Sequence, residues 1–271
     1  MRITACVQGS GLYCAVAEDR PADLLQQLQA VGGPRLRRSN RYIALSLLGA
    51  LDCVRGQQLL PDCAVYLSSG LGNVAETVAM LQPVLCEGLA PMPFSFINVS
   101  NNMAGFTLAQ QLGLHGRNLA VARRGGAFGA ALELALRDLR SGRVPQALVG
   151  AVDECVWPLA AHRQRLGLAA DAPLLEGSAW LLLAPADAQA DACGSLHWQA
   201  YADAAALSEA GHTLPEGSAW GMDAAISLPE GESPSRPAWA WIAALQQRPA
   251  RFLASYQLGV GYVGLDYQGC E

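Results

Sequence analysis

The chain has 271 residues, of which 52% are hydrophobic, so it can bury a large core in one large or two modest domains. Its formal net charge of −5 argues against a nucleic-acid binder, and no apolar run approaches the roughly 20 residues that cross a bilayer. The first residues lack the basic and apolar pattern of a signal peptide, which indicates a cytoplasmic protein without a membrane span.

Cysteine and lysine usage narrows the possible chemistry. Eight cysteines stand singly, without a C-x-x-C pair or a histidine at metal-ligand spacing, so we expect no metal site. The sequence contains no lysine, and all 18 basic residues are arginine. A Schiff base and a lysine phosphate clamp are therefore excluded, and we expect no cofactor.

Strand and helix patterns alternate through the first half of the chain. In order, they predict a strand followed by a Gly/Ser turn over 2–13, helices over 22–31 and 37–56, a strand running into a glycine turn over 63–73, and helices over 74–85 and 100–116. Ser100 is the expected N-cap of the last of these helices.

The stretch from Asn118 to Gly142 predicts a short strand, a sharp turn and a long amphipathic helix. Many enzymes use this shape to hold a nucleophile at a helix N-terminus, where backbone N–H groups favour an anion. The elbow turn here, Arg123–Gly126, contains no Ser, Cys or Thr. The apolar run over 146–154 follows as a strand covered on both faces, which completes a βαβ unit.

The second half of the chain has fewer predicted helices than the first. Strands are predicted over 177–187, 195–207 and 251–268, with a Pro/Ser/Glu loop over 229–237 and a strand or short helix over 238–246. The whole pattern predicts an α/β layered fold with parallel strands.

The stretch from Phe94 to Glu154 resembles the β-ketoacyl synthases, a family with the thiolase fold. In that family an N-x-x-A-G helix and two spaced glycines precede a strand, the A-C-x-(S/T)-G elbow, a helix and a GG-x-(D/E) strand end. The matching residues here are Asn102–Gly105, Gly113, Gly116, Gly142 and Gly150–Glu154. Their order and spacing carry the resemblance.

Three later stretches extend the resemblance. They are LLEGSAWLLLA over 174–184, HTLPEGSAWGMDAAI over 212–226 and the glycine-rich LGVGYVG over 258–264. The resemblance implies a thiolase-like layered α-β-α-β-α fold, with a complete N-terminal half over 1–190 and a truncated C-terminal half over 191–271.

The resemblance also implies where catalytic residues would stand. Counting back from Gly142 along the family's helix places Gly125 at the position of the acyl-carrying cysteine. The stretch WIAALQQ places Leu245 at the first catalytic histidine. The second histidine and the lysine belong between Leu245 and Leu258, where this sequence has neither. Glycine and leucine cannot hold an acyl chain or stabilise an enolate, so the resemblance implies no catalytic residue.

Some synthases of this family pair with a degenerate sister subunit, the chain length factor, which lacks the nucleophile and helps to form the partner's acyl tunnel. This sequence resembles such a subunit, as found in aryl polyene and type II polyketide systems. The resemblance implies a heterodimer with an active β-ketoacyl synthase, joined in part through the strand before the elbow turn. An acyl carrier protein would be a partner of the complex.

Several bulky residues near the two-fold axis of such a dimer are candidates for shaping the tunnel or the interface, and plain packing explains each of them as well. They are Met92, Phe94, Phe96, Met103, Phe106 and Phe128. Arg123 and Arg124 cannot easily be buried unpaired, so they are candidates to pair across the dimer or to fill the empty pocket.

A basic edge could attract an acidic acyl carrier protein, although a solvated helix edge explains the same residues more simply. It consists of Arg35, Arg37, Arg38 and Arg41.

Two other functions remain open. One is a thiolase-fold acyltransferase or decarboxylase that uses Ser68, Ser69 or a cysteine as its nucleophile. The other is a binding protein or homodimer without a synthase partner. His115, His162, His197 and His212 follow the pattern of ordinary surface or core residues, and His212 is expected to have a structural or pocket-lining role.

Overall fold

The computed structural model of the chain describes residues 2–17, 23–33, 35, 40–188, 193–212, 220–222, 228–258 and 261–270. For Phe94, Leu258 and residues 220–222 it describes the backbone alone. Most of the 212–226 motif, Gly259 and Val260 of the 258–264 motif, and Arg37 and Arg38 of the predicted basic edge lie outside the described residues. No helix in the described ranges is long and apolar enough to cross a bilayer.

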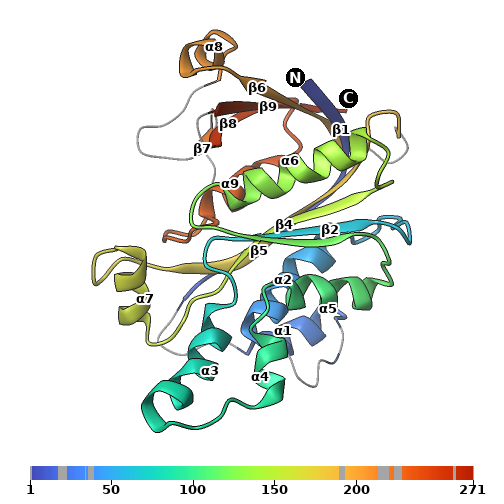
Figure 1. Cartoon of the computed structure of the whole chain (residues 1–271). Helices are drawn as coiled ribbons and strands as arrows, with labels where there is room; N and C mark the ends of the chain where they lie inside the picture. Colours follow the sequence, from blue (N-terminus) through green and yellow to red (C-terminus); the bar gives the residue numbers. More distant parts are fainter. Residues whose placement is uncertain are drawn as a thin grey trace.

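The strands of the described chain form one sheet that curves around two central helices (Figure 1). Its order is β3-β2-β4-β5-β1-β6-β9-β8-β7. The strands are β1 (Arg2–Val16), β2 (Ala64–Ser69), β3 (Asn118–Ala122), β4 (Ala147–Asp153), β5 (Leu175–Pro185), β6 (Gly194–Tyr201), β7 (Trp220–Met222), β8 (Arg251–Leu258) and β9 (Gly261–Gly269).

The predicted parallel arrangement is confirmed for three strands. β2 pairs in parallel with β3 and with β4, while β5 runs antiparallel to both β4 and β1. The remaining pairs, from β1–β6 to β7–β8, are antiparallel as well. Every residue of β4 is buried, as its apolar run predicts, because both faces of this strand are covered.

Five layers follow from this curvature. α1 (Leu24–Ala30), α2 (Arg41–Cys53) and α5 (Asn102–Leu112) cover the outer face of the N-terminal strands. α6 (Ala127–Arg140) and α9 (Arg236–Gln246) lie between these strands and the β6-β9-β8 strands. Of the helices in the described ranges, only α8 (Ala204–Glu209) covers the far face. The layered α-β-α-β-α fold with a truncated C-terminal half is thereby confirmed.

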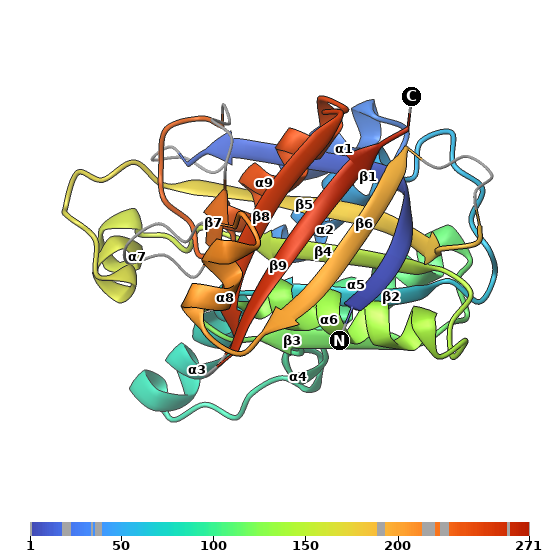
Figure 2. The same cartoon turned by 90° about the horizontal axis from the view of Figure 1, so that it is seen from above.

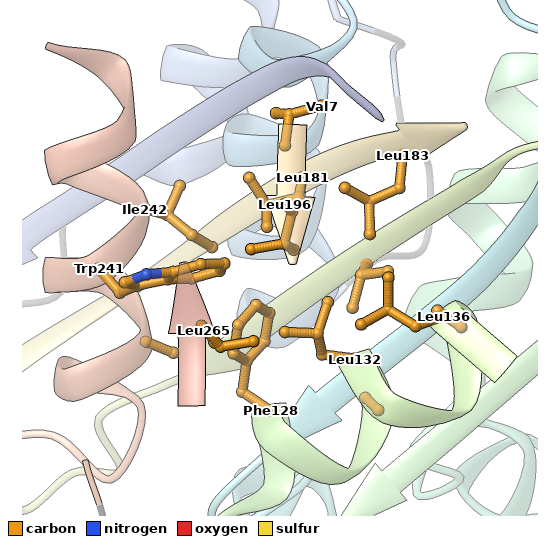
Figure 3. Packing of buried hydrophobic residues seen from close by; sticks show 14 of the residues in the cluster. Val7, Phe128, Leu132, Leu136, Leu181, Leu183, Leu196, Trp241, Ile242 and Leu265 are labelled. Carbon is orange, nitrogen blue, oxygen red and sulfur yellow. The ribbon is translucent and has the colours of Figure 1, made fainter. Parts of the chain in front are cut away.

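The main core lies around α6 and α9. α6 places Phe128, Leu132 and Leu136 four residues apart on one face, toward α9 and the strands (Figure 3). The rings of Phe128 and Trp241 pack with centroids 5.9 Å apart. Each half of the sheet therefore buries its inner face against the same pair of helices.

Three helices were not predicted, and two predicted boundaries are wrong. The Gly/Ser turn predicted after the first strand is also wrong, because β1 continues through Gly9 and Gly11 and stays paired with β5. α4 (Pro93–Asn98) and α7 (Leu159–Leu166) follow prolines, and α8 begins where the Asp203 carboxylate accepts the Ala206 N–H. The preceding strand was predicted to reach Leu207, but it ends at Tyr201, before this cap. α5 begins at Asn102, and the Ser100 carbonyl rather than its hydroxyl accepts a backbone N–H.

α3 (Val74–Glu87) contrasts with the central helices because none of its residues is buried. Together with α4 it extends below the body of the molecule in Figure 1. A helix that is apolar but unburied has a surface that another protein could cover.

Replacing Phe128 with alanine should lower the free energy of unfolding by about 3–5 kcal/mol, because a cavity would remain between α6 and α9. Phe106→Ala removes the same side chain where it is 54% exposed and should cost less than about 1 kcal/mol. The urea midpoint, followed by tryptophan fluorescence, compares the two variants. Equal losses would contradict the core position of Phe128.

Candidate functional site

The elbow turn is formed, and it is empty. β3 ends at Ala122, and α6 starts after Gly126, which adopts a left-handed conformation with φ of 66°. Gly125 is exposed, and a Cβ built on it meets no heavy atom within 4 Å. The position that the resemblance assigns to the nucleophile therefore has room for a side chain and carries none.

Leu245 is 3% exposed and belongs to the core around α9. It lines a pocket with Gly9 and Asp52, and this pocket shares no residue with the one beside the elbow turn. A leucine at this place offers neither a donor nor a proton. The structure thus gives Gly125 and Leu245 separate surroundings.

A pocket of about 260 Å³, here the elbow pocket, opens beside the turn. Its walls come from the glycine turn after β2, the elbow turn, the end of α7 and the loop before α9. The lining residues are Leu71, Arg124, Arg165, Leu166, Leu168, Glu232, Ser233 and Pro234. Apolar walls with two guanidinium groups suit a ligand that joins an apolar part to an acidic one.

Arg123 and Arg124 are both exposed, and neither forms an ion pair within the described part of the chain. Arg124 lines the elbow pocket, and the Arg123 N–H donates to the Ser69 carbonyl at 3.1 Å. A pairing of these arginines across a dimer stays a prediction.

A buried carboxylate lies behind the glycine turn that borders this pocket. Asp153, at the end of β4, is 1% exposed. Its Oδ1 accepts the Ser69 hydroxyl at 2.6 Å and the N–H groups of Gly70 and Leu71, while Oδ2 accepts the Ser235 hydroxyl at 2.6 Å. Burial raises the pKa of Asp153, although these donors oppose the rise. Asp153 therefore joins three chain segments at one point.

The two serines considered as nucleophiles are buried and hydrogen-bonded. Ser68 donates to the Gly150 carbonyl at 2.7 Å, and Ser69 donates to Asp153. Their exposures are 0% and 1%. In this conformation neither hydroxyl is accessible to a substrate. His162 is also buried, and burial together with Arg165 and Arg163 lowers its pKa to about 4.

Two glutamates are buried next to Asp153. Glu154 is 3% exposed; its Oε1 accepts the Ala75 N–H at 3.1 Å, and its Oε2 has no partner among the described atoms. Burial, with Glu176 and Glu76 nearby, raises the pKa of Glu154 to about 8. Glu154 is thus protonated at neutral pH and holds the start of α3.

Glu176 binds Arg41 through both carboxylate oxygens, and the guanidinium lies 4.8 Å from the Trp157 ring centre. The Arg41 side chain is only 17% exposed. The prediction that Arg41 belongs to a solvent-facing basic edge is therefore wrong, because a buried partner 135 positions away holds it. No group of three or more His, Cys, Asp or Glu in the described ranges could hold a metal ion.

The candidate interface residues fall in different surroundings. Met92, Phe96 and Phe106 are exposed by 69%, 56% and 54%, Met103 is half-buried, and Phe128 is in the core. The side chain of Phe94 lies outside the described residues.

Other exposed apolar residues of α3, α4 and the loop between them were missed by the sequence analysis. With Met92, Phe96 and Phe106 they form a set, here the apolar face, whose members are all at least 40% exposed: Val78, Leu81, Leu85, Leu89 and Ile97. The signal for them was the absence of a charged stripe along most of 74–98, which is unusual for an exposed helix.

Gly125→Cys should leave the free energy of unfolding within about 0.5 kcal/mol of the wild type, because its Cβ points into open space. Gly126→Cys should cost about 1–2 kcal/mol, since a side chain there strains a left-handed backbone. Urea unfolding of both variants measures the difference. A destabilised Gly125→Cys protein would show that the turn cannot accept a nucleophile.

Glu154→Gln should change how stability depends on pH. The folded chain keeps this proton between pH values of about 4.5 and about 8, where the unfolded chain loses it. Wild-type stability therefore falls as pH rises through this window, by up to about 1.4 kcal/mol per pH unit from this group. Glutamine keeps the shape without titrating, so the variant should gain on the wild type as pH rises. Unfolding curves that differ by the same amount at each pH would contradict this.

No family model matches the sequence, and no curated protein matches it. Solved structures do match. The ishigamide ketosynthase/chain length factor has a TM-score of 0.71 at 17% identity, with 99% of this chain and 100% of that chain covered. A ketosynthase (ApeO) in complex with its chain length factor (ApeC) from Xenorhabdus doucetiae has a TM-score of 0.57 at 13% identity, covering 98% and 99%.

A third structure is that of a type II polyketide synthase acyl carrier protein in complex with its ketosynthase, AntDE:AntF. It has a TM-score of 0.63 at 12% identity, with 100% of both chains covered. At such identities the likeness concerns the fold. The chain has the thiolase-like fold of ketosynthases and chain length factors.

Proposed function

We propose that this chain is a non-catalytic partner of an active β-ketoacyl synthase, in the role of a chain length factor. It would dimerise with the synthase in the cytoplasm and shape the acyl tunnel during fatty acid or polyketide-type elongation, as in aryl polyene or type II polyketide systems. The observation that carries the proposal is the empty elbow turn: β3 and α6 keep their geometry, and Gly125 leaves the nucleophile position bare.

The apolar face supports an obligate partner. Its eight side chains are exposed on consecutive helices, and soluble monomers rarely expose apolar patches of this extent. β3 adds an open edge, because among the described strands it pairs with β2 alone. An edge strand next to apolar helices suits pairing with a second sheet.

Buried hydrogen bonds hold the apolar face in place. Asn73, at the start of α3, donates through its side chain to the Asn98 carbonyl and through its N–H to the Asn101 side chain. The Glu154 side chain accepts a hydrogen bond from the Ala75 N–H, in the first turn of α3. These bonds tie α3 and α4 to the body although α3 buries none of its residues, which fits a surface organised for a partner.

In this proposal Met92, Phe96, Met103 and Phe106 pack against the synthase or line its tunnel, while Arg123 and Arg124 lie at the interface. An acyl carrier protein delivers chains to the complex. All chemistry belongs to the synthase, which supplies the thiolate and the donors that this chain lacks.

Co-expression with an intact synthase encoded beside this chain should give a heterodimer that buries about 1,600 Å² or more. Phe96→Asp should weaken it at least about tenfold, or about 1.4 kcal/mol, because a carboxylate would be desolvated at the interface. Leu60→Asp is the matched control, since Leu60 is 39% exposed and lies outside the apolar face. Light scattering and titration of the purified subunits measure both effects.

Two results would contradict the proposal. The first is a stable monomer of this chain that does not bind the synthase. The second is a covalent acyl adduct on the purified chain after incubation with an acyl thioester, detected by mass spectrometry, because it would mark a nucleophile at work in this subunit.

A further inference from the structure

A second polar pocket, here the outer pocket, lies far from the elbow turn in the fold. It opens on the outer face of β6, β9 and β8, beside α8, which lies over these strands in Figure 2. Its volume is about 110 Å³, and it shares no lining residue with the elbow pocket. The groups that line it include Arg2, His197, Tyr201, His212, Arg251 and Asp266.

The single carboxylate in this lining is already neutralised. Arg251 donates to both oxygens of Asp266, at 3.0 and 2.9 Å. Burial favours a higher pKa for Asp266, but the Arg251 bonds outweigh it and hold the pKa below its ordinary value. Because Arg251 neutralises Asp266, the Arg2 guanidinium gives the pocket an excess of positive charge.

The two histidines are held in fixed places. Nδ1 of His197 hydrogen-bonds with the Thr4 hydroxyl at 3.0 Å, from the neighbouring strand β1. His212 is 5% exposed and lies against Gly264, where a Cβ would come within 2.6 Å of Nε2. β9 thus needs glycine at this position for the ring to form one wall, and the Tyr201 ring stands 6.0 Å from it.

The surroundings of His197 also favour an anion. Burial and the charge of Arg2 lower the pKa of His197 from its ordinary value, although Asp266 and Gln268 oppose this shift. A bound anion would favour the imidazolium and reverse this effect.

We infer that the outer pocket binds a tetrahedral oxyanion of phosphate type, either free phosphate or the terminal group of a phosphomonoester. Arginine and histidine N–H groups are the donors that recognise such anions. The small volume and polar lining exclude an acyl chain from this place. The site is independent of the proposed function, because no residue of the elbow or the apolar face takes part.

Isothermal titration of the full chain with inorganic phosphate tests this inference, with a second titration by glycerol 3-phosphate. Saturable binding of phosphate alone identifies free phosphate as the ligand, and binding of both identifies a monoester. Arg2→Gln should weaken binding at least about tenfold, whereas Arg55→Gln removes an exposed arginine elsewhere and should change nothing.

An NMR measurement distinguishes phosphate binding in this pocket from nonspecific attraction of phosphate to the charged surface. The pKa of His197, followed by NMR, should rise when phosphate is added to the wild type and should stay unchanged in Gly264→Ala, where the added Cβ displaces the His212 ring that forms one wall of the pocket. The inference is overturned if no saturable binding occurs, or if Arg2→Gln and Arg55→Gln weaken it equally.

Discussion

The burial of α6 and α9 is the constraint on which the rest of the structure depends. Both helices are apolar on more than one side and need a sheet above and below. The short C-terminal half therefore keeps β6, β8 and β9, which close the core. A polar link joins these layers: Trp198 donates to the Tyr256 hydroxyl at 3.0 Å, and that hydroxyl donates to the Gly129 carbonyl at 3.2 Å. A Cβ on Gly129 would collide with the Tyr256 ring, so helix and strand fit only with glycine there.

The same constraint explains why an elbow persists without a nucleophile. α6 must begin at one place and in one direction to fill the core, and β3 and the turn deliver it there. Gly126 is required for that geometry because its backbone is left-handed, whereas a side chain at position 125 would contact nothing. The fold therefore constrains the residue at position 126 and leaves the residue at position 125 free to vary. The shape of the turn thus depends on Gly126, whereas the reactive group that such a turn could present depends on the neighbouring position 125.

Features that depend on residues close together in the sequence could be predicted, whereas features that depend on contacts between residues far apart in the sequence could not. The βαβ unit and the buried β4 follow from local periodicity, and α2 begins at Arg41, inside its predicted range, because Asn40 caps it. The resemblance to β-ketoacyl synthases implied Gly125 as the nucleophile position, and the structure places this residue in the turn between β3 and α6. The partners of Arg41 and Asp153 are remote in sequence, so neither the ion pair nor the carboxylate network could be foreseen. The outer pocket depends on a contact between His212, which follows α8, and Gly264 of β9, and no motif records this contact.

The buried carboxylates at the end of β4 hold neighbouring segments of this fold in place. Asp153 and Glu154 follow each other at the end of β4, and each satisfies backbone N–H groups of another segment: Gly70 and Leu71 in one case, Ala75 in the other. Removing Asp153 would leave buried donors unpaired, at about 1–3 kcal/mol each. Both acids thus have a role in folding, and Glu154, through the start of α3, also fixes the surface that a partner would cover. Strongly perturbed carboxyl groups are commonly a sign of catalysis; here the burial that comes with holding the turn after β2 and the start of α3 accounts for the raised pKa of both groups.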